Sequence, residues 1–208
     1  MAIVNMPDDL RCGRGCKIEQ VTFDMLTGSE VTGSTQSRPY GMPHWALSLV
    51  SPEAMRDSEA AKWKAMLLGL SGSVNVLAAY DPSRTEPRGS LRGAPTLAQA
   101  VAFGDTTLKL ATNAAPGAAT LEVGDWLQIG SGFGTSQLVL VLERAQEDGA
   151  AQMLVRFVNP ARRAYAVGTP ITWQRPRGYF RKPAGRIGWT PYSRSHTLAM
   201  AVDLVEAW

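Results

Sequence analysis

The chain has 208 residues, of which 45% are hydrophobic and 19% are charged, and its formal net charge is +3. This size allows one large hydrophobic core or two small ones, and the weak net charge does not indicate a nucleic-acid-binding protein. No window approaches eighteen uninterrupted apolar residues, and the N-terminal residues lack the pattern of a secretion signal, which argues against membrane insertion. We therefore expect the chain to act in the cytoplasm or in particles assembled there.

The first fifty residues predict three strands. Polar and apolar residues alternate over 17–24 and a second strand is expected over 30–36, with Thr27 and Gly28 supplying the turn of a hairpin. A third strand over 45–50 is predicted to be buried on at least one face. Pro43 places the beginning of that strand at an edge or a bulge.

A single convincing helix is predicted over 58–70. Apolar side chains recur there at spacings of three and four: Ala60, Trp63, Leu67 and Leu70. Asp57 or Ser58 is expected to cap the first turn, and Gly72 lies where a glycine commonly ends a helix. A tryptophan on such a stripe is typical of a core anchor, so Trp63 is predicted to pack the helix against a sheet.

The segment 94–174 has a different pattern of residues. Short β runs separated by glycine-containing turns are expected at 106–110, 119–122, 125–129, 137–143, 152–158 and 170–173. They predict a small barrel or curled sheet without a helix. The apolar segment 197–208 needs a partner sheet, which the N-terminal strands can supply. We therefore predict a discontinuous first domain, 1–92 and 176–208, with a barrel-like domain inserted at 93–175.

We find no catalytic, cofactor-binding or metal-binding residues. The glycine-rich segment 130–134 lacks the Lys-Ser/Thr ending of a phosphate loop, so a hairpin tip is expected. Two pairs of neighbouring acids have no evident reason to converge on a substrate as a hydrolase requires: Asp24 with Glu30, and Glu143 with Glu147. Cys12 and Cys16 lack the second pair of ligands of a zinc site; free thiols, a local disulfide and a metal site all remain open.

Basic residues concentrate near the end of the chain. Six of them lie within twenty residues that contain no Asp or Glu: Arg175, Arg177, Arg181, Lys182, Arg186 and Arg194. The preferred interpretation is a solvated strand edge or a charged contact between subunits. A surface that faces nucleic acid is the alternative.

The order of features along the chain resembles a recurring group of bacteriophage and prophage tail proteins. The segments that carry the resemblance are 46–52 (Ala-Leu-Ser-Leu-Val-Ser-Pro), 59–63 (Glu-Ala-Ala-Lys-Trp), 69–75 (Gly-Leu-Ser-Gly-Ser-Val-Asn), 80–82 (Tyr-Asp-Pro), 87–89 (Pro-Arg-Gly), 93–95 (Gly-Ala-Pro) and 121–130 (Leu-Glu-Val-Gly-Asp-Trp-Leu-Gln-Ile-Gly). These are patterns of a scaffold, and none is a catalytic signature.

Within that group the chain looks most like a distal tail protein, the ring that joins the tail tube to the tail tip or baseplate. The resemblance implies a mainly β fold, with a tail-tube-like β-sandwich, one packed α-helix and an inserted small β-barrel domain. It also implies a homo-hexameric ring in the virion, in contact with the tail tube protein and the tip or hub proteins. The genome would pass through the channel without specific binding. Many distal tail proteins instead carry the accessory domain after the ring domain.

The physical pattern agrees with a ring subunit. The segments 26–33 and 35–42 are rich in Gly, Ser, Thr and Arg, and suit ordering on a neighbouring subunit. Three alternatives stay open: another tail tube or hub component, a cell-wall hydrolase, and a carbohydrate- or surface-binding β module. The last would present Trp126, Phe133 or Trp173 to a glycan.

Overall fold

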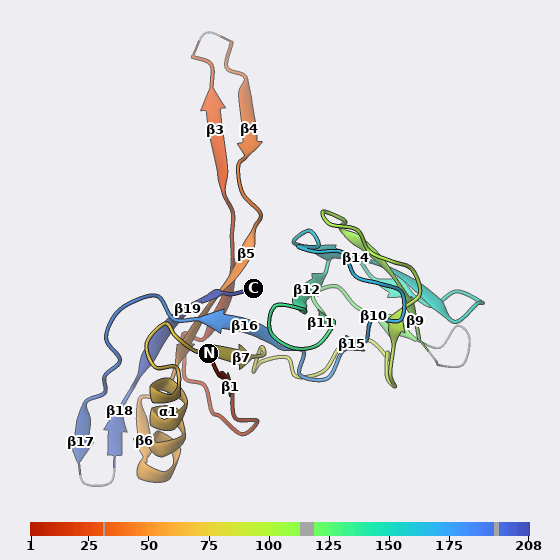
Figure 1. The fold of residues 1–208 in the computed structure, drawn as a ribbon. Coiled ribbons are helices and arrows are strands. Elements are labelled where there is room, and N and C mark those ends of the chain that lie inside the picture. The colour runs from red at the N-terminus through yellow and green to blue at the C-terminus, as the bar shows by residue number, and fades with distance from the viewer. Residues whose placement is uncertain (31, 113–118, 194–195) are drawn as a thin grey trace.

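The structure is a computed structural model of the chain, and it describes all residues except 31, 113–118 and 194–195 (Figure 1). The described residues form nineteen strands and one helix, which confirms the mainly β class. Six strands build the largest sheet of the first domain: β1 (Ile3–Asn5), β2 (Lys17–Val21), β5 (His44–Val50), β7 (Val76–Ala79), β16 (Gly178–Arg181) and β19 (Ala201–Glu206).

This sheet joins the two ends of the chain. Its strand order is β1-β7-β16-β19-β5-β2, with β1 parallel to β7 and the other neighbours antiparallel. β19 pairs along β5, with Val202 opposite Leu49 and Leu204 opposite Leu47. All four side chains are buried on the same face of the sheet. The predicted pairing of the C-terminal strand with the N-terminal strands is therefore confirmed.

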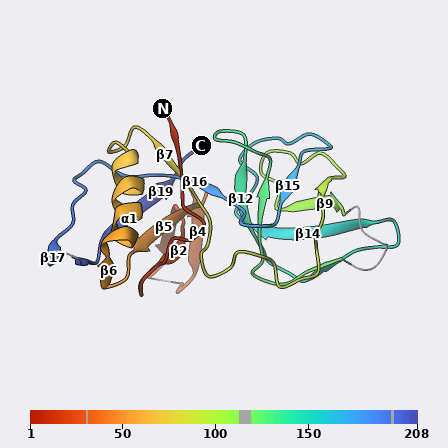
Figure 2. The same ribbon diagram turned by 90° about the horizontal axis from the view of Figure 1, so that it is seen from below.

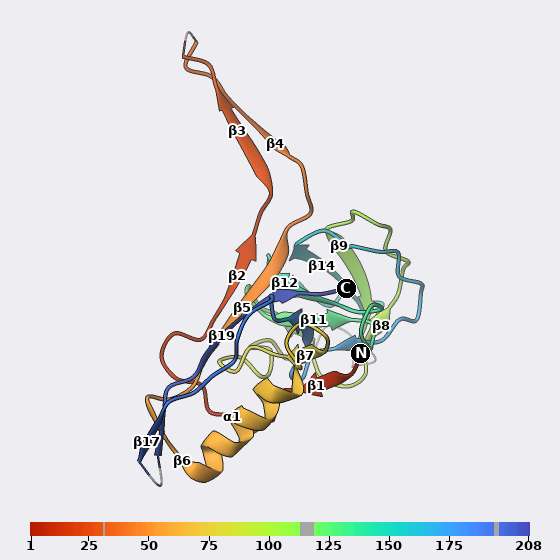
Figure 3. The same ribbon diagram turned by 60° about the vertical axis from the view of Figure 1, so that its left-hand side comes forward.

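The single helix, α1 (Asp57–Gly69), covers the lower part of this core (Figure 3). It follows β6 (Ala54–Arg56), which joins β17 (Pro191–Ser193) and β18 (His196–Leu198) in a three-stranded sheet. Trp63 is only 1% exposed and its indole N–H donates to the Arg11 carbonyl oxygen at 3.2 Å. Its predicted role as the anchor of the helix is confirmed.

The predicted N-cap is wrong. The helix begins at Asp57, and the residue before it, Arg56, is extended and makes no capping hydrogen bond through its side chain. Pairing of β6 with β18 fixes the backbone up to Arg56, so the chain turns into the helix one residue earlier than the pattern of side chains suggests. Asp57 and Glu59 still lie in the first turn, where a carboxylate interacts favourably with the helix dipole.

The inserted segment folds into a nearly closed barrel (Figure 2). Six strands follow one another in the order β15 (Ile171–Thr172), β11 (Trp126–Ile129), β12 (Gln137–Val141), β14 (Gln152–Val158), β9 (Thr107–Ala111) and β8 (Thr96–Leu97). The first and last approach each other, because Thr96 bridges Pro170 and the Ile171 N–H donates to the Pro95 carbonyl oxygen at 3.0 Å. A short pair, β10 (Thr120–Leu121) with β13 (Ala145–Gln146), lies beside it.

The described residues form two hydrophobic cores. The barrel interior is one, and the other lies between the large sheet and α1. Trp126 and Leu138 belong to barrel strands but pack in the first core, where the Trp126 and Trp45 ring centroids lie 4.9 Å apart, edge to face. The Trp45 indole N–H also donates to the Leu138 carbonyl oxygen at 3.0 Å. The barrel therefore covers part of the core of the first domain.

Deletion of residues 93–174, bridged by a short Gly/Ser linker, tests the predicted division into domains. We expect a folded protein that unfolds cooperatively at a lower temperature than the full chain, because Trp45 loses its contacts with Trp126 and Leu138. Circular dichroism during heating measures the transition. If neither the shortened chain nor the isolated 93–175 segment unfolded cooperatively, the division would be wrong.

A two-stranded ribbon projects from the end of the large sheet (Figures 1 and 3). It consists of β3 (Asp24–Gly28) and β4 (Thr35–Pro39), and it continues the pairing of β2 with β5. The predicted turn at Thr27 and Gly28 is wrong, because both residues lie within β3. The chain turns beyond Gly28, where Gly33 has a positive φ of 66° and the Ser29 hydroxyl accepts the Thr32 N–H.

Candidate assembly surface

Both strands of the projecting ribbon are exposed along their whole length. We call residues 22–41 the arm; all of its described residues are exposed. Among them are large hydrophobic side chains, with Leu26 69% and Tyr40 71% exposed. Exposed apolar groups gathered on one element are typical of surfaces that bind another protein. A two-stranded hairpin is at best marginally stable alone in water, so the arm suits a surface that becomes ordered against a partner.

Both faces of the arm carry apolar groups. Cross-strand pairing places Met25 opposite Arg38 on one face and Leu26 opposite Ser37 on the other. Phe23 and Tyr40 lie below Met25 and Arg38 on the first face, and the Tyr40 N–H donates to the Phe23 carbonyl oxygen at 2.8 Å. The predicted contact segments 26–33 and 35–42 thus fall mainly on the arm. Val31 lies outside the described residues.

Aromatic side chains join the base of the arm to the C-terminus. The ring centroid of Phe23 lies 6.0 Å from that of Tyr40 and 5.2 Å from that of His44, which stacks on it. His44 in turn lies 6.1 Å from Trp208. The direction of the arm is therefore fixed at its base by side chains from β5 and from the end of the chain.

A buried ion pair fastens this region to the barrel. Arg162 lies in the segment between β14 and β15 of the barrel. Its guanidinium donates to the Glu206 carboxylate on β19 at 2.8 Å. The same carboxylate oxygen accepts the Trp45 backbone N–H at 2.7 Å. The guanidinium also lies 3.9 Å from the centre of the Trp208 ring. One arginine thus contacts both the core strand and the aromatic base of the arm.

Burial changes the acid–base properties of this cluster. It raises the pKa of Glu206 above its ordinary value, although Arg162 and the Trp45 N–H act in the opposite direction. Burial also lowers the pKa of His44, and the nearby Arg162 charge adds to that effect. No pattern in the sequence points to this ion pair, because Arg162 and Glu206 are far apart in the chain and belong to no motif.

The large sheet of the first domain ends in two terminal strands, β1 and β2. β2 carries Lys17 and Glu19 on its exposed side, where they form an ion pair at 2.9 Å. Terminal strands present unpaired backbone groups, which neighbouring chains can use for pairing. The arm and these two strands are therefore the surfaces best suited to association.

The basic residues of the C-terminal segment have different environments. Arg175 and Arg177 both pair with Asp8, at 2.8 and 3.1 Å. Lys182 is buried, and its ammonium group donates to the Pro183 carbonyl oxygen. Arg186 is exposed, while Arg194 lies outside the described residues. Two of the six charges are thus paired with a carboxylate and a third is buried, which gives little support to a nucleic-acid surface.

The three aromatic residues of the carbohydrate-binding alternative are engaged within the chain. Trp126 is buried, and its indole N–H donates to the Asp81 carboxylate at 3.1 Å. Phe133, in the 130–136 loop between β11 and β12, packs edge to face on Tyr179. The Trp173 indole N–H donates to the Gly93 carbonyl oxygen. Of the three, only Trp126 is buried, whereas Phe133 and Trp173 are half-buried, so the burial of all three that would weaken the carbohydrate-binding alternative is met in part.

The acidic pairs considered for catalysis are also kept apart. Glu143 pairs with Arg156 at 2.8 Å, whereas Glu147 is buried and accepts hydrogen bonds from the Thr112 hydroxyl and the Ala119 N–H. Asp24 lies on the exposed arm. Within the part of the chain that the structure describes, no group of three or more His, Cys, Asp or Glu residues is arranged to hold a metal ion. No described helix is long and apolar enough to cross a bilayer.

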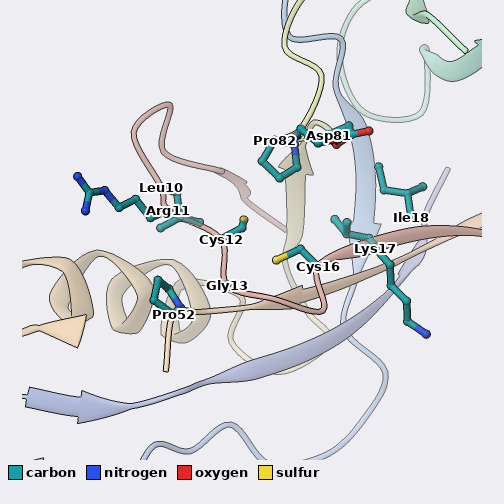
Figure 4. Close-up of a pocket in the computed structure, with 12 residues that line it drawn as sticks. Leu10, Arg11, Cys12, Gly13, Cys16, Lys17, Ile18, Pro52, Asp81 and Pro82 are labelled. Atoms are coloured by element: carbon teal, nitrogen blue, oxygen red, sulfur yellow. Dashed lines mark hydrogen bonds between the residues drawn. The ribbon is translucent and has the colours of Figure 1, made fainter. Parts of the chain in front are cut away.

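A cavity of about 590 Å³ opens beside the N-terminal loop (Figure 4). Cys12 and Cys16 line it together with apolar side chains, and both are free thiols. Asp81 is the acidic residue in its wall. Both carboxylate oxygens of Asp81 accept hydrogen bonds, one from Ser83 and the other from the Trp126 indole.

Comparison with known proteins adds no assignment. No family model matches the chain, and neither does any curated protein. A function is therefore proposed below from the arm, the edges of the sheet and the sequence resemblance to phage tail proteins.

Proposed function

We propose that this chain is a non-enzymatic structural protein of a phage tail, a ring subunit that joins the tail tube to the tail tip or baseplate. The observation that carries the proposal is the arm, a fully exposed ribbon with Leu26, Met25 and Tyr40 at its surface. An exposed ribbon with apolar side chains is stabilised further when a partner covers it. The sequence resemblance supplies the identity of the assembly.

The asymmetry of the surfaces supports a ring. The arm projects from one end of the large sheet, and nothing in the twofold symmetry of a simple dimer would require such a reach. A heterologous contact, in which the arm of one subunit lies on a different surface of the next, repeats around an axis and closes when the rotation permits. The resemblance implies six subunits, with the tail tube protein on one side and the tip or hub proteins on the other.

Imaging of tail particles that contain the chain tests this proposal. We expect a closed ring on the tail axis, with an open channel and with each arm in contact with a neighbouring subunit. A location away from the axis, or a single copy in each particle, would contradict it. Because assembly depends on concentration and on partners, a monomer of the purified chain does not decide the question.

A charge placed on the arm should prevent assembly without unfolding the subunit. We expect Leu26→Asp to abolish incorporation into tail particles, because it puts a carboxylate into an apolar contact, while the melting temperature stays unchanged since Leu26 is exposed in the monomer. Leu154→Asp is the matched control, because Leu154 is similarly exposed, at 64%, on the barrel. Equal incorporation of the two variants would show that the arm is not the contact surface.

A further inference from the structure

The cavity beside the N-terminal loop holds the two cysteines of the chain, and no part of the proposed assembly uses them. Cys12 and Cys16 belong to a single loop, and Figure 4 shows both sulfur atoms turned into the same space. Three residues separate the two cysteines along the chain, and both line the same cavity. Both thiols are partly accessible and line a cavity that admits small molecules.

The backbone holds this loop in place. The Gly13 N–H donates to the Val50 carbonyl oxygen at 2.7 Å, and a Cβ atom at Gly13 would lie 2.3 Å from the Ser51 carbonyl oxygen. The Cys16 thiol donates to the Val50 carbonyl oxygen at 3.1 Å and accepts the Val50 N–H at 3.2 Å. Gly15, with a φ of +101°, provides the turn between the two cysteines. The thiols are therefore brought together by the fold of the loop.

We propose that Cys12 and Cys16 form a modification site, an oxidisable dithiol that a small disulfide such as oxidised glutathione converts into an intramolecular disulfide. The cavity gives the reagent access to both sulfur atoms. A metal site fits less well, since a structural zinc ion takes four ligands and both oxygens of the Asp81 carboxylate are engaged. The proposal does not depend on the tail assignment.

The exchange runs in two steps. The Cys16 thiolate attacks one sulfur of oxidised glutathione, so that a mixed disulfide forms and one glutathione thiolate leaves. Cys12 then attacks the Cys16 sulfur and displaces the second glutathione, whose thiolate takes up the Cys12 proton. Two protein thiols are oxidised and one glutathione disulfide is reduced to two thiols. Burial, with a further contribution from Cys16, raises the pKa of Cys12 to about 12, which makes Cys12 the second nucleophile.

The disulfide would fasten the loop beneath the helix. The carbonyl of Arg11, next to Cys12, accepts the indole N–H of Trp63 from α1. Closing a covalent ring at Cys12 and Cys16 restricts this segment in the unfolded chain as well as in the folded one. The oxidised protein is therefore expected to unfold at a higher temperature than the reduced protein.

Equilibration of the full chain in mixtures of reduced and oxidised glutathione tests the site. After acid quenching and alkylation of the remaining thiols, mass spectrometry should show one transition, from two alkylated thiols to a product that has lost two hydrogen atoms and carries no glutathione. Peptide mapping should locate the link between Cys12 and Cys16. A stable mixed disulfide, a disulfide-linked dimer or a chain that stays reduced in oxidised glutathione alone would overturn the proposal.

Single-cysteine variants test the order of attack. Cys12→Ser should accumulate a stable glutathione adduct on Cys16, whereas Cys16→Ser should react at least tenfold more slowly, because Cys12 is the thiol whose pKa is raised. Equal rates would overturn the order of the two steps. Stoichiometric zinc binding by the wild-type chain that blocks its oxidation would overturn the dithiol assignment in favour of a metal site.

Discussion

Replacing Trp63 with alanine is expected to lower the free energy of unfolding by about 3–5 kcal/mol, the usual cost of removing a large aromatic side chain from a core. Trp63 is 1% exposed, lies on the buried face of α1 and donates to the Arg11 carbonyl oxygen, so the variant loses both packing and a hydrogen bond. For a chain of this size the melting temperature should fall by about 2–4 °C for each kcal/mol.

Trp189→Ala is the matched control for this experiment. Trp189 is 39% exposed and has the Lys64 ammonium group 5.3 Å from its ring centre. Its removal is expected to cost no more than about 1 kcal/mol, since an exposed cation–π contact is weak. If Trp63→Ala left the melting temperature unchanged, the helix face would not be packed in the monomer and would be a candidate assembly surface.

Breaking the ion pair between Arg162 and Glu206 should lower the free energy of unfolding about as much as Trp63→Ala does. Arg162→Ala leaves the Glu206 carboxylate buried without its cation, and removal of one partner of a buried pair typically costs about 3–5 kcal/mol. Denaturant unfolding at neutral pH measures the loss. The barrel and the large sheet would also lose one of their connections, so the two should no longer unfold in one step.

The stability lost in Arg162→Ala should become smaller as pH falls. Burial raises the pKa of Glu206 in the folded chain, so its contribution to stability is greatest at low pH and declines as pH rises through that pKa. Removal of Arg162 raises this pKa further, because the cation that favours the charged form is gone. The stability deficit of Arg162→Ala should therefore shrink as pH falls toward about 4, the ordinary pKa of glutamate.

A double variant separates this effect from other titrations. His44 also faces Arg162, and its lowered pKa should move back toward the ordinary value when that charge is removed. In Arg162→Ala with Glu206→Gln the buried carboxylate at position 206 is gone, so the stability deficit should be smaller than in the single variant, and the pH dependence that remains in the acid range should be that of His44. A deficit that stayed constant with pH in Arg162→Ala itself would show that Glu206 is not buried as the structure has it.

Local patterns in the sequence were sufficient for most of the elements. The stripe containing Trp63 predicted the helix, and the alternation over 45–50 and 197–208 predicted two buried strands and their pairing, because side-chain periodicity reflects which face meets a core. Regular turns between short apolar runs likewise predicted the barrel. The absence of a partner for the last strand indicated the discontinuity of the first domain.

Some local details followed the tertiary structure instead. The helix begins at Asp57 without a side-chain cap because β6 pairs with β18 up to Arg56. The hairpin extends through Thr27 and Gly28 because strand pairing continues to Gly28, and the turn forms only at the serines and glycine beyond it. At the start of the helix, pairing of β6 with a distant strand outweighed the preference of Asp57 and Ser58 for a capping position. In the hairpin, continued strand pairing outweighed the turn preference of Thr27 and Gly28.

The sequence by itself determined the class of the fold, the place of the helix and the apolar strands, because each depends on the spacing of neighbouring residues. Only the tertiary structure decided which distant residues meet: Trp45 with Trp126 and Arg162 with Glu206 across the two domains, and His44 with Trp208 at the base of the arm. Such contacts join residues that are far apart in the chain, and no local periodicity encodes them. The exposure of the arm also depends on the tertiary structure, because a strand is buried only where other parts of the chain pack against it.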